Sequence, residues 1–105
     1  MKSALNKDSL NSIISEIFNT NQYNLVDSTQ TLNNHIYKIH YRNNYYSLKF
    51  YRKYGDKYKN KRMRIETNAL NLLRENNLNN VPKVFGLSKK YNCAIFTWIE
   101  GKNIT

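Results

Sequence analysis

The 105-residue chain is poor in several kinds of residue, and each shortage excludes a class of protein. Its only cysteine is Cys93, so the chain cannot form an internal disulfide, which points to a reducing compartment. No apolar run approaches the ~20 residues that a membrane-spanning helix needs, and the N-terminus MKSALNKDSL lacks the apolar stretch of a signal peptide. We therefore expect one small cytoplasmic domain over residues 1–105, without a membrane segment.

Acidic residues are also scarce: seven of them face 17 lysines and arginines, which leaves a net charge of +10. Between Lys49 and Arg64 the chain is densely basic, and Asp56 is the only acidic residue there. This predicts a polyanionic partner, which could be nucleotide phosphates, nucleic acid or an acidic protein. A solvated helix entry, or lysine enrichment from an AT-rich genome, would give the same composition. The candidate polyanion-binding residues are Lys57, Lys59, Lys61, Arg62 and Arg64.

Apolar residues at helical spacing predict two helices. The first begins at a cap on Asp8 or Ser9. Its apolar face is made of Leu10, Ile13, Ile14, Ile17 and Phe18. The second runs from about Asn60 to Asn76 and ends before Pro82. Its main apolar stripe is made of Ile65, Ala69, Leu72 and Leu73.

Short runs of alternating residues predict five strands. A tight turn at Asn43-Asn44 is expected to join the second and third strands. Together with the helices, the order predicts an α+β fold: a five-stranded antiparallel sheet with an N-terminal helix and one long helix inserted between strands three and four. The predicted strands are Tyr23–Thr29, His35–Arg42, Tyr45–Arg52, Val84–Leu87 and Cys93–Trp98.

Lys49 and Glu66 are charges at positions where the pattern predicts burial. Lys49 lies in the strand-like run YYSLKFY, and Glu66 lies four residues before Leu70 on one side of the second helix. Either charge alone is costly to bury, whereas the two together are tolerable. A strand lysine held by a helix glutamate positions nucleotide phosphates in kinase-type folds. A solvated lysine and a surface glutamate are the alternative interpretation.

Four segments resemble, in order and spacing, the N-terminal lobe of aminoglycoside phosphotransferase and choline kinase-like enzymes, which is similar to the small lobe of protein kinases. They are YYSLKFY, RIETNALNLL, VPKVFG and AIFTWIEG. The resemblance extends from about Tyr23 to Gly101. It departs at the loop between the first two strands, STQTLNNH, which has no glycine to cover the phosphates.

The resemblance implies a kinase-like nucleotide-binding lobe of a small-molecule phosphotransferase. Lys49 would bind the α- and β-phosphates of ATP, and Glu66 would orient Lys49. The small side chain of Ser47 would leave room for the base. The family places its catalytic base and Mg²⁺ ligands in a C-terminal lobe, so we expect ATP binding without phosphoryl transfer by this chain alone.

The resemblance also assigns the hinge that holds adenine. Phe96 would precede the hinge, and the Thr97 carbonyl and the Ile99 amide would hydrogen-bond the base. Without a second lobe, apolar surface near Phe96, Trp98 and Ile99 would be exposed, so we expect low stability or self-association.

Two further interpretations remain open. The chain could be a stand-alone basic protein that binds nucleic acid or an acidic protein, or a regulator that docks on a complete kinase. His35 and His40 lie five residues apart, on opposite faces of the predicted strand, and with one distant cysteine they predict no metal site.

Overall fold

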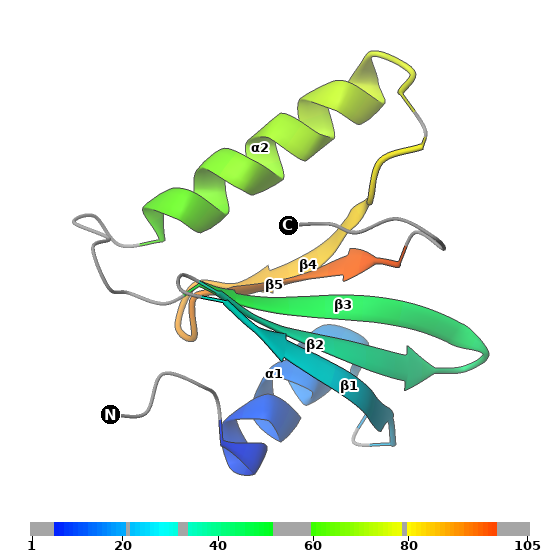
Figure 1. Ribbon diagram of the computed structural model, residues 1–105, viewed down its shortest axis with the longest axis vertical. Coiled ribbons are helices and arrows are strands. Elements are labelled where there is room, and N and C mark those ends of the chain that lie inside the picture. Colours follow the sequence, from blue (N-terminus) through cyan, green and yellow to red (C-terminus); the bar gives the residue numbers. More distant parts are fainter. Residues whose placement is uncertain (1–5, 21, 32–33, 52–59, 79, 99–105) are drawn as a thin grey trace.

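The computed structural model describes residues 6–20, 22–31, 34–51, 60–78 and 80–98 (Figure 1). These residues form the helices α1 (Lys7–Phe18) and α2 (Lys61–Glu75) and the strands β1 (Asn24–Gln30), β2 (Asn34–Tyr41), β3 (Asn44–Tyr51), β4 (Val84–Ser88) and β5 (Cys93–Thr97). In the chain, α1 precedes β1, and α2 lies between β3 and β4. None of the helices in this part of the chain is long and apolar enough to cross a membrane.

The five strands form one antiparallel sheet with the order β1-β2-β3-β5-β4. The predicted α+β class with a five-stranded antiparallel sheet is therefore confirmed. Tyr37 pairs with Leu48, and Ala94 pairs with Lys49. Because side chains alternate along a strand, Leu48 and Lys49 point to opposite faces. Helix α1 covers the Leu48 face and helix α2 lies over the Lys49 face (Figure 1).

Helix α1 begins at Asn6, whose side chain accepts a hydrogen bond from the Ser9 amide at 2.7 Å. The predicted cap at Asp8 or Ser9 is wrong, because both residues already lie inside the helix. The helix approaches β4 closely at Gly86, where a Cβ would stand 2.7 Å from Cγ2 of Ile17. Its buried face and the sheet form the larger apolar core, made of Leu10, Ile13, Ile14, Tyr37, Ile39, Leu48, Cys93 and Ile95.

Helix α2 does not bury the stripe that its sequence predicts. Ile65 and Leu72 are 59% and 60% exposed, and Leu73 is exposed as well. Met63 and Thr67 are the buried residues instead. Met63 stands two positions before Ile65, and Thr67 stands two positions before Ala69. The buried side of α2 is therefore rotated by about 200° around the helix axis from the predicted stripe. Hydrogen bonds from Asn60, at the start of α2, to the Lys89 carbonyl and to Asn92 account for this rotation.

The turn between β2 and β3 lies one residue earlier than predicted. Arg42 and Asn43 occupy it, with φ of 50° and 64°, the positive values that a tight hairpin requires. Tyr41 pairs with Asn44, so Asn44 already belongs to β3. The side-chain amide of Asn44 donates to the Arg42 carbonyl at 3.3 Å.

Candidate functional site

Lys49 and Glu66 form an ion pair between the sheet and α2. The Lys49 Nζ lies 2.9 Å from Oε1 and 3.2 Å from Oε2 of Glu66. The lysine side chain is 7% exposed and that of the glutamate 28%, so the pair is held at the edge of the interior. Burial of both charges is tolerable because each neutralises the other. The structure thus brings together the two residues that the sequence analysis singled out.

Tyr51 is a third member of this cluster, and the sequence analysis did not assign it a role. It stands two positions after Lys49 on the same face of β3, and its hydroxyl donates to Glu66 Oε1 at 2.6 Å. The Lys49 Nζ lies 5.2 Å from the centre of the Tyr51 ring. Burial raises the pKa of Tyr51 far above its ordinary value, and the hydrogen bond to Glu66 adds to this shift. The spacing of two residues on one face was the signal that could have found it.

A buried amide network fixes the start of α2 to the sheet. The Asn60 side chain donates to Asn92 Oδ1 at 2.8 Å and to the Lys89 carbonyl at 3.1 Å. The Asn92 side chain in turn donates to the Tyr51 carbonyl at 2.6 Å. Asn60 lies on the same side of α2 as Met63, so these bonds set the rotation that buries Met63. The network therefore places Glu66 within reach of Lys49.

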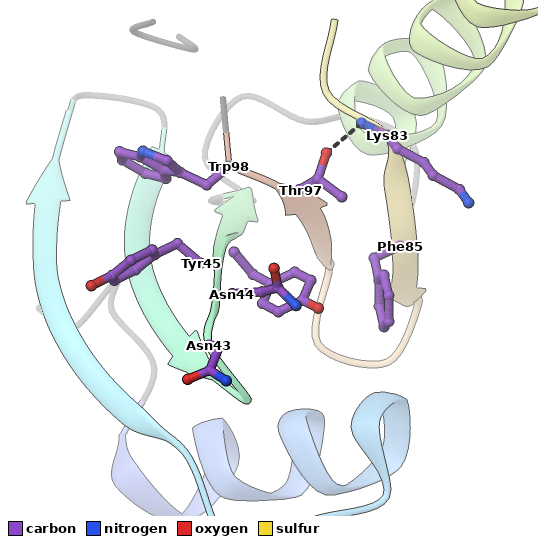
Figure 2. A pocket seen from close by; sticks show the side chains of 8 residues that line it. Asn43, Asn44, Tyr45, Lys83, Phe85, Thr97 and Trp98 are labelled. Atoms are coloured by element: carbon purple, nitrogen blue, oxygen red, sulfur yellow. Dashed lines mark hydrogen bonds between the residues drawn. The ribbon is translucent and has the colours of Figure 1, made fainter. Parts of the chain in front are cut away.

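Two of the residues predicted to surround the base, Ser47 and Phe96, lie on this face but are covered. Ser47 is 4% exposed and Phe96 is 1% exposed. Phe96 packs in the smaller core with Tyr51, Met63 and Ala94, so the expectation of exposed apolar surface at Phe96 is wrong. Thr97 ends β5, where its hydroxyl accepts from the Lys83 amide at 2.9 Å (Figure 2). Ile99 lies outside the described residues.

Aromatic residues and a lysine occupy the open end of the same face. The Nζ of Lys38 stands 4.7 Å from the Tyr45 ring centre and 4.4 Å from that of Trp98. The Trp98 amide donates to the Tyr45 carbonyl at 3.2 Å, which extends β5 along β3. A pocket of about 430 Å³ opens at this end of the sheet, lined by Tyr45 and Trp98 and also by Tyr46 and Phe85, which contact Phe18 of α1 on the opposite face. Figure 2 shows the Tyr45 and Trp98 rings on one side of it and Phe85 across from them.

Searches for relatives identify none: the chain matches no protein-family model, no curated protein and no solved structure.

Three of the five predicted polyanion-binding residues lie at the start of α2. Lys61 and Arg64 are exposed there, and Arg62 is half-buried. The first turn of α2 contains no acidic residue, and Asn60 makes no side-chain capping bond. Lys57 and Lys59 lie outside the described residues.

Among the described residues, no three histidine, cysteine, aspartate or glutamate side chains gather. His35 stacks on Tyr37 in the interior, with ring centres 4.4 Å apart, whereas His40 contacts Tyr45 on the other face. Burial raises the pKa of the Cys93 thiol to about 12. A thiol in that environment stays protonated and behaves as a small apolar core residue.

Proposed function

We propose that this chain is a kinase-like nucleotide-binding lobe that binds the phosphates of ATP through Lys49. The observation that carries the proposal is the ion pair of Lys49 with Glu66, at 2.9 and 3.2 Å. A lysine ammonium has three donors, so a partner that takes one or two of them leaves at least one for a phosphate oxygen. Glu66 holds the ammonium in place, which removes the entropic cost of ordering a free lysine when a phosphate binds.

Tyr51 strengthens this arrangement. Its hydroxyl occupies one lone pair of Glu66 Oε1 at 2.6 Å, so the carboxylate is held from two sides. A carboxylate fixed in this way cannot follow Lys49 outward, and the ammonium keeps one orientation on the sheet face. This is the preorganisation expected of a phosphate-binding lysine.

Magnesium at nucleotide sites is bound by one or two carboxylates together with the phosphates, and no three acidic, histidine or cysteine side chains gather in the described ranges. The proposal therefore covers nucleotide binding, and we derive no transfer step through the ion. The ligands that the family uses would have to come from a second lobe. The buried free thiol of Cys93 is compatible with the reducing cytoplasm that we propose as the compartment.

The test is calorimetric titration of the chain with ATP and Mg²⁺ at moderate salt. We expect the wild type to bind and Lys49→Ala to lose binding. Lys90→Ala is the matched control, since it removes the same charge from the exposed β4–β5 turn. Circular dichroism would show whether Lys49→Ala still folds, and the double variant Lys49→Met/Glu66→Leu removes the pair without leaving a buried charge. Equal binding by wild type and both Lys49 variants would refute the proposal.

A second candidate function is polyanion binding at the start of α2. The observation that favours it is the placement of Lys61 and Arg64 in the first turn, where the helix dipole disfavours cations. An anionic partner would relieve this unfavourable placement. Salt-sensitive binding of single-stranded DNA or of an acidic protein would then survive Lys49→Ala. It would be lost when Lys57, Lys59, Lys61, Arg62 and Arg64 are neutralised together.

A further inference from the structure

The Lys38 ammonium lies against two aromatic rings on the same face as the phosphate-binding lysine. Its Nζ is 4.7 Å from the Tyr45 ring centre and 4.4 Å from the Trp98 ring centre. Lys38 pairs with Ser47 across β2 and β3. Because Ser47 is small, the lysine chain can cross the sheet toward β5. The π-faces of Tyr45 and Trp98 are therefore both turned toward the place that the Lys38 ammonium occupies above the sheet. Two π-faces there favour an electron-poor or cationic group.

This aromatic end lies at the correct distance from Lys49 for a nucleotide. Tyr45 and Lys49 are four residues apart on one face of β3, which separates them by about 14 Å along the strand. An extended nucleoside triphosphate has a comparable span from its base to its outer phosphates. A ligand with its phosphates at Lys49 and lying along β3 would thus bring its base to Tyr45 and Trp98.

The position predicted from family resemblance is much less accessible. Ser47 and Phe96 are 4% and 1% exposed, so a flat ring cannot lie on them without moving other side chains. Tyr45, in contrast, is 42% exposed.

We infer that Tyr45 and Trp98 bind the base of the nucleotide by stacking, in the place where Lys38 now contacts the rings. This inference rests on the proposed function, which it deepens by naming how the base is recognised. Stacking uses the π-face that every base has, so ATP and GTP should bind alike. The displaced Lys38 ammonium stays on the same face and adds positive charge near the phosphates.

The chain has one tryptophan, so Trp98 is a built-in fluorescent reporter of the base. The experiment titrates the full chain with ATP, GTP and inorganic tripolyphosphate, and measures Trp98 emission beside the calorimetric affinity. Free N-acetyltryptophanamide corrects for light absorbed by the bases. The variants are Tyr45→Ala, Tyr45→Phe as the conservative match, and Lys49→Ala.

We expect ATP and GTP to quench Trp98 with similar affinities, and tripolyphosphate to bind more weakly and without quenching. Stacking on one ring is worth on the order of 10-fold in affinity. Tyr45→Ala should therefore weaken ATP by about 10-fold and leave tripolyphosphate unchanged, whereas Tyr45→Phe should bind ATP as the wild type does. Tyr45 is exposed, so neither change threatens the fold.

Two results would overturn the inference, and they differ in what they say of the proposed function. Binding of ATP that requires Lys49, but without quenching and without an effect of Tyr45→Ala, would place the base elsewhere and leave the proposed function intact. Absence of calorimetric binding for both ATP and tripolyphosphate would refute the proposed function and the base site together.

Discussion

Helices α1 and α2 lie on opposite faces of one sheet and are held there by different forces (Figure 1). Helix α1 buries the apolar residues that its periodicity marks, with Ile13 and Ile14 fully covered. Helix α2 leaves its most apolar stripe in solvent and turns Met63, Thr67 and the Glu66 edge toward the sheet. Its position is set by an ion pair and by amide hydrogen bonds rather than by the greatest apolar area.

The difference between the two helices separates stability from function. An apolar contact such as that of α1 is strong and non-directional, and it suffices to anchor a helix. The contacts of α2 are directional, since Glu66 must meet Lys49 and Asn60 must meet Asn92. Directional contacts hold a charged group in one orientation, which a binding site requires. We therefore interpret the α1 face as the structural side and the α2 face as the functional side.

The largest expected effect is on the α1 side. Ile13→Ala removes a fully buried side chain from the larger core and should lower the free energy of unfolding by about 3 kcal/mol. Urea denaturation followed by circular dichroism measures this loss. Met63→Ala removes a buried side chain of α2. If it lowered the free energy of unfolding clearly more than Ile13→Ala does, the contrast between the two helices would be refuted.

The next effect concerns the ion pair. Glu66→Ala leaves the Lys49 ammonium, 7% exposed, without its carboxylate and should cost about 2 kcal/mol of unfolding free energy. The double variant Lys49→Met/Glu66→Leu is the matched control, because it removes both charges together. We expect it to be more stable than Glu66→Ala but about 1 kcal/mol less stable than the wild type, because the buried Tyr51 hydroxyl loses its acceptor on Glu66. A double variant as unstable as Glu66→Ala would show that geometry rather than an unpaired charge accounts for the loss.

A smaller effect belongs to Tyr51 and depends on pH. Its pKa is raised in the folded chain, so above its ordinary value of 10.0 the unfolded chain binds fewer protons than the folded chain. Stability from this group is complete below pH 10 and should fall as pH rises further. Cys93 acts in the same direction from its ordinary value of 9.0 upward, with a folded pKa of about 12.

Tyr51→Phe separates the contribution of Tyr51 to the alkaline loss of stability from that of Cys93. It removes one hydrogen bond to Glu66, which should cost about 1 kcal/mol at neutral pH. It should also make the fall in stability above pH 10 shallower than in the wild type. Thermal unfolding at a series of alkaline pH values provides the measurement. An unchanged alkaline slope would assign the fall to Cys93 and the other tyrosines.

The smallest effect is expected on the outer stripe of α2. Leu72→Ser exchanges a side chain that is 60% exposed, so the free energy of unfolding should change by no more than about 0.5 kcal/mol. Ile65→Ser, at a position that is 59% exposed, should have an equally small effect. A loss of 2 kcal/mol or more in a urea melt would show that this stripe is buried in solution.

Much of this architecture could be predicted from the sequence because its signals are local. The period-2 alternation around Leu48 and Lys49 predicts both the strand and the face to which each side chain points. Periodicity also places α1 and its buried face. The pairing of Lys49 with Glu66 was inferred from two charges at positions expected to be buried, and the distance of 2.9 Å agrees with it.

Other features depended on contacts between residues far apart in the chain. The caps and turns differed by one to three residues, because Asn6 and Arg42 compete with equally suitable neighbours. Burial of Phe96 was missed, since it requires Met63 and Tyr51 to meet β5. The aromatic contacts of Lys38 with Tyr45 and Trp98 join three strands, and no spacing in the sequence indicates them.

The sequence by itself determined the fold class, the order of the elements and the two charges at the centre of the candidate site, because alternation and helical periodicity act over a few neighbouring residues. Only the tertiary structure decided which side of α2 faces the sheet. The apolar stripe with Ile65 and Leu72 competed there with the side that carries Met63 and Thr67, and the Asn60–Asn92 hydrogen bond, between residues 32 positions apart, favours the second. Hydrophobicity draws a helix onto a sheet without specifying its rotation, whereas hydrogen bonds and ion pairs require particular atoms to meet.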